Sequence, residues 1–210
     1  MKYSRRPFTL IELLITMAII AVLAGILLPT IRSAMRSTKV GKARSEISSL
    51  ITAMKLYESE YDLMPFGYDK DEDATTAVMG DTDYGDDVVY DTTEYKKMIS
   101  FLSQTGSTAD KEEGNARKLR ILSVKKATEY LDPWKNRYYV VGDVNGDNSI
   151  AKKLVVGMYD DGKDLPRSVV VWSKGADKKI DEDDPEAKVN RDNIYSLETN
   201  WDKAKGHVIP

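Results

Sequence analysis

The sequence predicts an α+β protein in which a long N-terminal membrane-spanning α-helix packs on a small C-terminal antiparallel β-sheet. Between Phe8 and Leu28, 17 of 21 residues are apolar, and we call this stretch the apolar segment. Apolar residues then recur at three- and four-residue spacing as far as Tyr61, which indicates an amphipathic helix. After residue 131 the chain changes to short β-rich runs separated by turn residues. The composition is therefore that of a polar body attached to one apolar helix.

The apolar segment is long enough, at about 30 Å of helix, to cross the hydrocarbon core of a bilayer. A secretory signal peptide has the same basic start, and Val22–Ala24 fits a small-residue cleavage site. The length of the segment and the presence of Glu12 oppose that interpretation. A plain signal anchor accommodates the length but not the carboxylate, which costs on the order of a few kcal/mol in a membrane unless it is paired. We therefore expect Glu12 to have a function.

The helix is predicted to continue past the membrane and to cover residues 8–61. Pro29 lacks an N–H donor and disturbs only the preceding turn, so we expect a kink rather than an end. Gly41 lowers the helix propensity by about 1 kcal/mol and marks a candidate flexible point. We expect the first half of this helix to be bare and its second half to pack on the body. The apolar stripe of the amphipathic helix consists of Ile31, Met35, Val40, Ile47, Leu50, Ile51, Met54, Tyr57 and Tyr61.

Residues 62–130 are predicted to be a variable connecting region. Between Asp69 and Glu94 there are ten acidic residues against one basic residue, which favours a solvated loop. Helical and β-type signals return at residues 95–102 and 116–130, where we expect short helices or strands.

The C-terminal body, residues 131–210, is predicted to contain a three-stranded antiparallel meander. Its β-rich runs are Tyr138–Val141, Leu154–Tyr159 and Ser168–Trp172, with glycine-containing turn signals between them. Residues 143–147 also resemble the start of an EF-hand loop. The positions of the loop glycine and the closing acid hold Asn148 and Leu154, so a plain hairpin is favoured.

The composition argues against several classes of function. The chain has no cysteine and one histidine, His207, which excludes a disulfide framework and a histidine-rich metal site. It has no phosphate-binding loop and no dinucleotide fingerprint, so we expect no enzyme activity. The formal net charge of −3 argues against nucleic-acid binding. Five basic residues without aromatic neighbours follow the apolar segment, and we interpret them as a solvated face or as partners of acidic surfaces on adjacent subunits: Arg32, Arg36, Lys39, Lys42 and Arg44.

The stretch Arg5–Leu14 closely resembles the processing signal of type IV pilins and type II secretion pseudopilins. The resemblance implies that a prepilin peptidase removes residues 1–7 as a leader peptide and that Phe8, the new N-terminus, is methylated. Glu12 then stands at the fifth mature position, where the family has a glutamate. This implies that Glu12 pairs with the N-terminal amine of a neighbouring subunit in a fibre. Pro7 departs from the pattern, because the family usually has glycine before the cut.

Two segments of the body resemble the major pseudopilin of type II secretion. The first, Asp132–Tyr138, is similar to that family's DPWGNPY turn, with Lys135 and Arg137 in the places of glycine and proline. The second begins with Ser173–Asp177 and ends with Asp192–Ile194, which in the family bracket a calcium-binding loop.

The resemblance implies calcium as the cofactor, and the physical chemistry of the loop agrees with it. Calcium takes six to eight oxygen ligands in flexible loops, and one ion would neutralise the repulsion among the carboxylates of residues 177–192. The alternative is a solvated acidic loop without an ion. The ligands that we expect from the two ends and the interior of this loop are Asp177, Asp181, Asp192 and Asn193.

The resemblance implies a structural subunit of a type II secretion pseudopilus, which assembles through its N-terminal helix to drive protein export. It implies a single-pass protein of the bacterial inner membrane with its body in the periplasm. The implied partners are further copies of the chain, other pseudopilins, the prepilin peptidase and the inner-membrane secretion platform. The alternative is a type IV pilin or minor pilin of a surface fibre for adhesion, motility or DNA uptake. A third class is a membrane-anchored, calcium-dependent binding domain that does not polymerise.

Overall fold

The computed structural model divides into two compact units, Met1–Gly41 and Lys42–Pro210, and one helix contributes to both. The residues that the structure describes are 9–65, 76–79, 88–90, 92–105, 114–124, 130–143, 146–151, 155, 163–179, 181, 187–197, 200–202 and 207–209.

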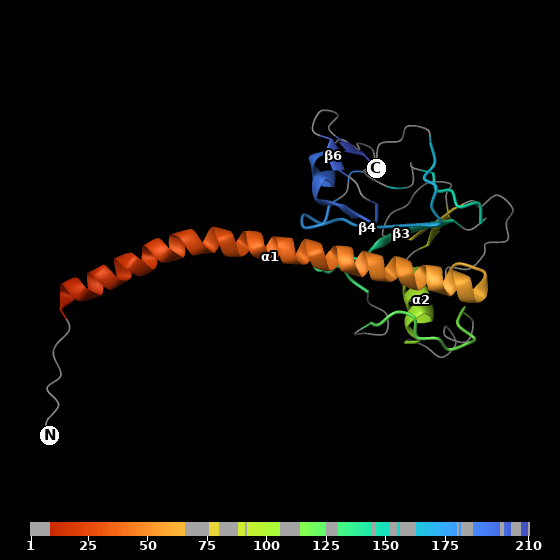
Figure 1. Cartoon of the computed structure of the whole chain (residues 1–210), viewed down its shortest axis with the longest axis horizontal. Coiled ribbons are helices and arrows are strands. Elements are labelled where there is room, and N and C mark those ends of the chain that lie inside the picture. The colour runs from red at the N-terminus through yellow and green to blue at the C-terminus, as the bar shows by residue number, and fades with distance from the viewer. Residues whose placement is uncertain are drawn as a thin grey trace, which may run out of the picture. The chain divides into compact units, whose positions relative to one another are not determined.

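The first element is α1, Leu10–Tyr61, whose 52 residues correspond to about 78 Å of helix. The helix continues through Pro29, so the predicted single helix is confirmed (Figure 1).

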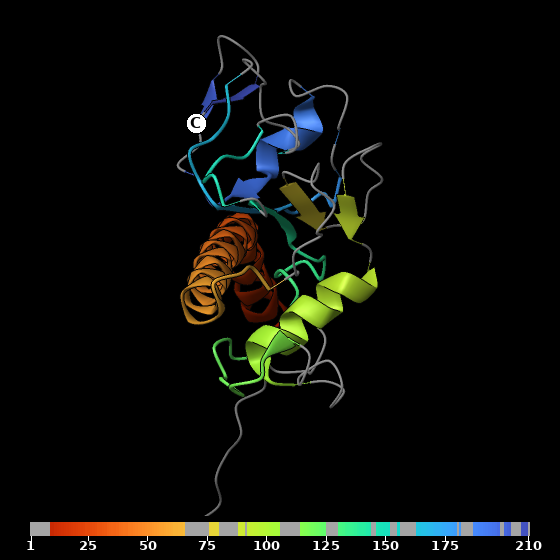
Figure 2. The same ribbon diagram turned by 90° about the vertical axis from the view of Figure 1, so that its right-hand side faces the viewer.

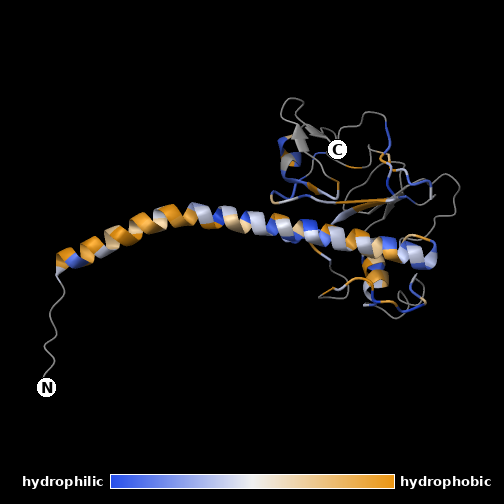
Figure 3. Cartoon of the chain, viewed as in Figure 1, coloured by the Kyte–Doolittle hydropathy of each residue, from blue (hydrophilic) through white to orange (hydrophobic). Residues whose placement is uncertain are grey.

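Residues 10–41 of α1 are almost entirely exposed. Figure 3 shows the first part of this helix as mostly hydrophobic on the side in view. Large side chains such as Leu13 and Leu28 are 51% and 57% exposed. Ile31 and Met35, the first two residues of the predicted apolar stripe, are 50% and 59% exposed, as expected for the first half of the helix. The apolar periodicity of a helix does not reveal where its packing partner begins.

The second half of α1 packs in the body along one face. Its buried residues recur at three- and four-residue spacing, as expected for an amphipathic helix. They are Ala43, Ile47, Leu50, Ala53, Met54 and Tyr57. The Tyr57 hydroxyl donates to the Gly114 carbonyl oxygen, and the Tyr61 hydroxyl donates to Asn115 Oδ1. Hydrogen bonds thus fix the end of α1 to residues 114–115.

The helix α2, Thr92–Ser103, forms where the sequence predicted a short element at residues 95–102. Its buried side chains include Tyr95, Met98 and Leu102. Figures 1 and 2 show α2 and the main sheet on different sides of the second half of α1. Parts of the body on these two sides therefore cover the buried residues of this half of α1, while others such as Leu56, 48% exposed, stay at the surface.

The main sheet has five strands in the order β2-β1-β3-β4-β5. All neighbouring pairs are antiparallel except β1 and β2, which are parallel. A separate pair is formed by β6 and β7. The bounds are β1 Thr76–Met79, β2 Val88–Tyr90, β3 Tyr139–Asp143, β4 Val169–Ser173, β5 Ile194–Tyr195, β6 Asn200–Asp202 and β7 His207–Ile209. The predicted α+β class is confirmed.

Two predictions about the sheet are wrong. The meander required Leu154–Tyr159 between the other two runs, but β3 pairs directly with β4, with Tyr139 opposite Trp172. Val155 is buried and lies outside any strand, and the rest of that run lies outside the described residues. The region predicted as a solvated acidic loop, residues 69–94, contributes β1 and β2, because β3 offers β1 an edge to pair with.

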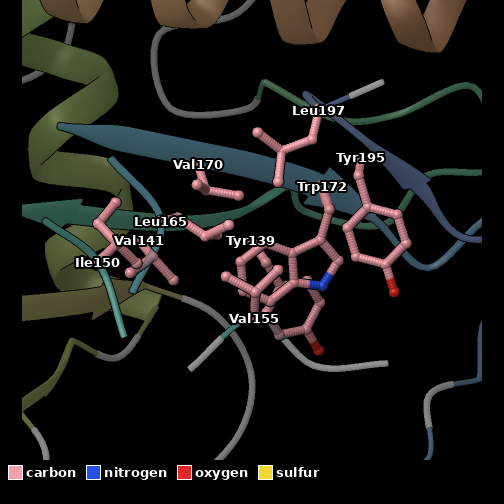
Figure 4. Close-up of a cluster of buried hydrophobic side chains, with 9 residues drawn as sticks. All are labelled: Tyr139, Val141, Ile150, Val155, Leu165, Val170, Trp172, Tyr195 and Leu197. Atoms are coloured by element: carbon pink, nitrogen blue, oxygen red, sulfur yellow. The ribbon is translucent and has the colours of Figure 1, made fainter. Parts of the chain in front are cut away.

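Tyr139 and Trp172 lie on one face of the sheet and belong to a cluster of buried hydrophobic side chains (Figure 4). The rings of Tyr139 and Trp172 stack with their centroids 5.1 Å apart. On β3 and β4 every residue is buried, so both faces of these central strands are covered. The cluster consists of Tyr139, Val141, Ile150, Val155, Leu165, Val170, Trp172, Tyr195 and Leu197.

The turn after β3 is held by the carboxylate of Asp143. Its Oδ1 accepts the Gly146 N–H at 2.9 Å and its Oδ2 accepts the Asn148 N–H at 2.7 Å. Asn148 has a left-handed backbone with φ 58°, which asparagine tolerates better than most residues. These bonds describe a turn that the side chain of Asp143 caps.

Candidate functional site

The first candidate site is the start of α1, where Glu12 hydrogen-bonds to Thr9. Glu12 Oε2 accepts the Thr9 backbone N–H at 2.9 Å and the Thr9 hydroxyl at 2.8 Å. The Glu12 N–H in turn lies 3.4 Å from Thr9 Oγ1. Residues T-x-x-E with these reciprocal bonds form a capping box, which satisfies N–H groups that would otherwise be orphaned at the helix start. The capping box is visible in the sequence, but only Glu12 was predicted as a functional residue and Thr9 was missed.

Glu12 retains one carboxylate oxygen for a partner. Both bonds from Thr9 go to Oε2, and no described residue donates to Oε1. Glu12 is also the one titratable residue between Thr9 and Ile31. A bare apolar helix therefore presents a single carboxylate with an available oxygen near its N-terminal end.

In the body, Asp132 joins the two segments that resemble a pseudopilin. Asp132 Oδ1 accepts the Trp134 and Asn136 N–H groups at 2.9 and 2.8 Å, which closes the turn after residue 132. Asp132 Oδ2 accepts the hydroxyl of Ser173 at 2.7 Å, at the end of β4. Ser173 Oγ accepts the Gly175 N–H at 3.1 Å. One carboxylate, 4% exposed, thus fixes the turn to the start of the acidic loop.

Two backbone positions in these segments have the left-handed conformation. Gly175 has φ 72°, and a Cβ there would lie 2.1 Å from the Asp192 carbonyl oxygen, so only glycine fits. Lys135 has φ 73° at the position where the resembled family has glycine. A non-glycine residue in this region costs on the order of 1 kcal/mol. Lys135 thus holds a backbone conformation that glycine would adopt at lower cost.

The two ends of the acidic loop, residues 177–192, are joined by polar side chains. Asp192 Oδ2 accepts the N–H groups of Ala176 and Asp177 at 2.7 and 3.0 Å. Asn190, fully buried, accepts the Asp181 N–H through Oδ1 at 3.1 Å and donates to the Asp181 carbonyl at 2.9 Å. Asn190 was missed from the sequence, because an asparagine within a polar run carries no pattern of its own.

Residues 8–28 match the family model described as the prokaryotic N-terminal methylation motif. The match supports a type IV pilin-like protein. It covers the apolar segment, including Glu12, and not the body. No curated protein and no solved structure matches the chain.

The pilin-like motif and the exposure of the apolar helix both indicate a membrane anchor. α1 is long and apolar enough to cross a membrane, and no residue of its most apolar 18-residue stretch is buried in the protein. Motif and helix fit a single-pass anchor in the inner membrane, and a pilin-like protein is expected to assemble into a fibre after action of a prepilin peptidase. Pro7 and Phe8, the residues at the predicted cut, lie outside the described residues.

The structure brings Asp177, Asp192 and the backbone of Asp181 to one end of the body, as the hydrogen bonds show. Across the ranges described, no three acidic or histidine side chains are close enough to hold a metal by themselves. Residues 182–186 of the loop lie outside these ranges. Asn193 Oδ1 is buried and has no hydrogen-bond partner among the described residues, and such an oxygen can serve as a ligand of a cation. The metal site stays a prediction.

Proposed function

We propose that the chain is a structural subunit of a type II secretion pseudopilus, which assembles through α1 and drives the export of proteins. The observation that carries the proposal is the single carboxylate, Glu12, on an otherwise bare apolar helix within the methylation motif. The Asp132–Ser173 hydrogen bond supports the secretion class, because it joins the two segments that resemble the major pseudopilin.

The assembly step follows from the chemistry of Glu12. After removal of the leader, the new N-terminal amine of one subunit is positively charged at neutral pH. Glu12 of its neighbour can accept a hydrogen bond from that amine through Oε1 while Oε2 keeps the bonds from Thr9. In low dielectric such a pair is far stronger than in water. The apolar side chains around Glu12 then pack helix against helix as the subunit leaves the lipid.

Substitution of Glu12 by glutamine tests this assembly step. Glu12→Gln keeps the shape and removes the charge, so the amount of membrane-inserted subunit should stay the same and fibre formation should fall at least about tenfold. Thr9→Val is the matched control, because it removes a bond to Glu12 and keeps the carboxylate, and it should assemble. Glu12→Gln subunits that form fibres as well as the wild type would refute the proposed pairing.

A secretion assay separates the pseudopilus from the surface pilus. If the proposal holds, cells that lack this chain retain exoproteins in the periplasm, and the wild-type chain restores export. Loss of surface fibres with normal export would instead assign the chain to a type IV pilus. This assay does not depend on the outcome of the Glu12 substitution.

We also propose that the acidic loop binds calcium. Asn193 Oδ1, Asp177, Asp181 and the second oxygen of Asp192 are the side-chain groups that would hold the ion, and backbone carbonyls would complete its shell. When bound, the ion would neutralise the loop's repulsion. The anchored ends support the proposal, because Asp192 fixes one end to Ala176 and Asn190 fixes the interior to Asp181.

Thermal unfolding of the full chain in detergent tests the calcium proposal. With calcium at 100 times its dissociation constant, the body should gain about 2.7 kcal/mol. Asp177→Ala should abolish most of this gain, whereas Asp183→Ala, in the middle of a run of acids, should change it less. Absence of binding at millimolar calcium in calorimetry would show that the loop is solvated and holds no ion.

A further inference from the structure

The part of α1 that follows the apolar segment carries exposed basic side chains that the proposed function does not use. We call them the basic cluster: Arg32, Arg36, Lys39, Lys42 and Arg44. The first three are spaced by four and three residues. At 100° per residue they fall within about 60° of one another, on one face of the helix. These three residues of the cluster therefore form one basic face, and Lys42 and Arg44 lie outside it.

The positive charge of this cluster is almost uncompensated. Lys42 Nζ lies 3.5 Å from Glu46 Oε1. Within the described part of the chain, Arg32, Arg36, Lys39 and Arg44 form no ion pair. From Thr9 to Arg44 the sequence contains a single acid, Glu12, which lies at the other end of the apolar segment. Among the residues that the structure describes, no acid of the chain therefore neutralises Arg32, Arg36, Lys39 or Arg44.

We propose that the basic cluster binds the phosphate groups of anionic phospholipids in the leaflet that faces the body. Arg32 follows Leu28 by four residues, which places it about 6 Å along the helix from the end of the apolar segment. The headgroup zone on each side of a bilayer is about 5–8 Å thick. Arg36 and Lys39 lie about 12 and 16 Å along, and their long side chains can reach back towards the phosphates.

Charge and position favour lipid over a second copy of the chain as the partner. The headgroups adjoin the cluster whenever the apolar segment lies in a bilayer, whereas a neighbouring subunit is present only in an assembly. Arginine also matches phosphate with two parallel hydrogen bonds, which a lipid phosphate can accept. The proposal requires a membrane-inserted helix and holds for a pseudopilin and for a pilin alike.

Spin-labelled lipids measure this preference directly. The full chain is reconstituted in phosphatidylcholine vesicles that contain a trace of spin-labelled phosphatidylglycerol or of spin-labelled phosphatidylcholine. Electron paramagnetic resonance then gives the association of each lipid with the protein. Each basic residue near an anionic surface strengthens attraction about fivefold. The wild type should therefore prefer phosphatidylglycerol about tenfold or more, and Arg32→Gln/Arg36→Gln/Lys39→Gln should lower this preference to near one.

A matched variant controls for total charge. Lys55→Gln/Lys96→Gln/Lys179→Gln removes three positive charges from exposed positions of the body and should keep the preference. Raising the salt from about 0.1 M to 1 M should weaken it, because the Debye length falls from about 10 to 3 Å. All substituted side chains are exposed, so tryptophan fluorescence of the body should stay unchanged in both variants.

Two results would overturn the proposal. One is equal association of the two lipids with the wild type. The other is a cluster variant that keeps its lipid preference but loses chemical cross-links between copies, which would assign the basic face to a neighbouring subunit.

Discussion

The two halves of α1 have the same secondary structure and opposite environments. In residues 10–41 the large apolar side chains are exposed, and Ile20 and Ile26 are each 64% exposed. In residues 42–61 the side chains of Leu50 and Met54 are fully buried against the body. The first half is apolar on all sides and the second on one face, which is the difference between a helix made for lipid or a fibre core and a helix made for a protein surface. Composition around the helix, and not helix propensity, separates the two functions.

The two halves also use their carboxylates differently. Glu46 accepts the Tyr138 hydroxyl at 2.7 Å through Oε2 and pairs with Lys42 through Oε1, while its backbone carbonyl accepts the Tyr130 hydroxyl at 3.0 Å. Among the described residues, Glu12 bonds only to Thr9, within its own helical turn. Both oxygens of Glu46 are thus occupied in the folded subunit. Glu12 keeps one oxygen for a neighbour.

Alkaline pH should unfold the body and spare the first half of α1. Burial raises the pKa of Tyr57 and of Tyr130 from 10 to about 12, and burial also raises the pKa of Tyr95 and Tyr138. Tyrosines in the unfolded chain ionise at a lower pH than the same tyrosines in the folded body. Their contribution to the free energy of unfolding is therefore complete below pH 10 and is lost as the pH rises from about 10 to 12. Residues 10–41 contain no tyrosine. Circular dichroism should show a residual helix after the tryptophan signal has changed, and unaltered tryptophan fluorescence at pH 12 would contradict this.

Truncation of one leucine in each half should give unequal costs. Leu50→Ala should lower the free energy of unfolding of the body by about 3 kcal/mol, because Leu50 is fully buried. Leu23→Ala, at a side chain 54% exposed, should leave it unchanged. Denaturant titration of the detergent-solubilised chain measures both. Equal costs would mean that the first half also packs on the body.

Removal of Glu46 should have a smaller effect. Glu46→Ala leaves the hydroxyl of Tyr138, a fully buried residue, without its acceptor, which costs about 2 kcal/mol. Glu12→Ala should leave the unfolding of the body unchanged and affect only assembly. The same titration tests both variants, and a body destabilised by Glu12→Ala would remove the distinction between the two carboxylates.

The smallest expected change is a gain. Lys135→Gly should stabilise the body by about 1 kcal/mol, because glycine adopts the observed φ of 73° without steric cost. Lys178→Gly, at φ 61° in the acidic loop, is the matched variant and should gain a similar amount. A loss of stability in Lys135→Gly would show that the lysine side chain contributes contacts that outweigh its backbone strain.

The features that could be predicted from the sequence are local, whereas those that were missed depend on contacts between residues far apart along the chain. The helix of residues 10–61 was predictable because its apolar periodicity is a local pattern. β1 was missed because the Thr76–Met79 run is short and lies among acids, and only its pairing with β3 makes it a strand. The order of the strands was predicted wrongly for the same reason, since residues 139–142 pair with residues 169–172 rather than with a nearer run.

The candidate sites divide in the same way. Thr9 could have been predicted beside Glu12, because a capping box is read from four consecutive residues. The hydrogen bond between Asp132 and Ser173 spans 41 residues and depends on the completed sheet, so it could not be predicted from the sequence. The same limit applies to Asn193, whose buried oxygen is visible only in the folded loop.

The mass of the N-terminal peptide of the mature protein tests the central claim most directly. The account predicts a chain that begins at a methylated Phe8. Because the lost leader carries three basic side chains, Lys2, Arg5 and Arg6, the formal net charge changes from −3 to −6. Peptide mass spectrometry of membranes would show this N-terminus in wild-type cells and its absence in cells without prepilin peptidase. An intact Met1, or a chain that begins after Ala24, would contradict the account.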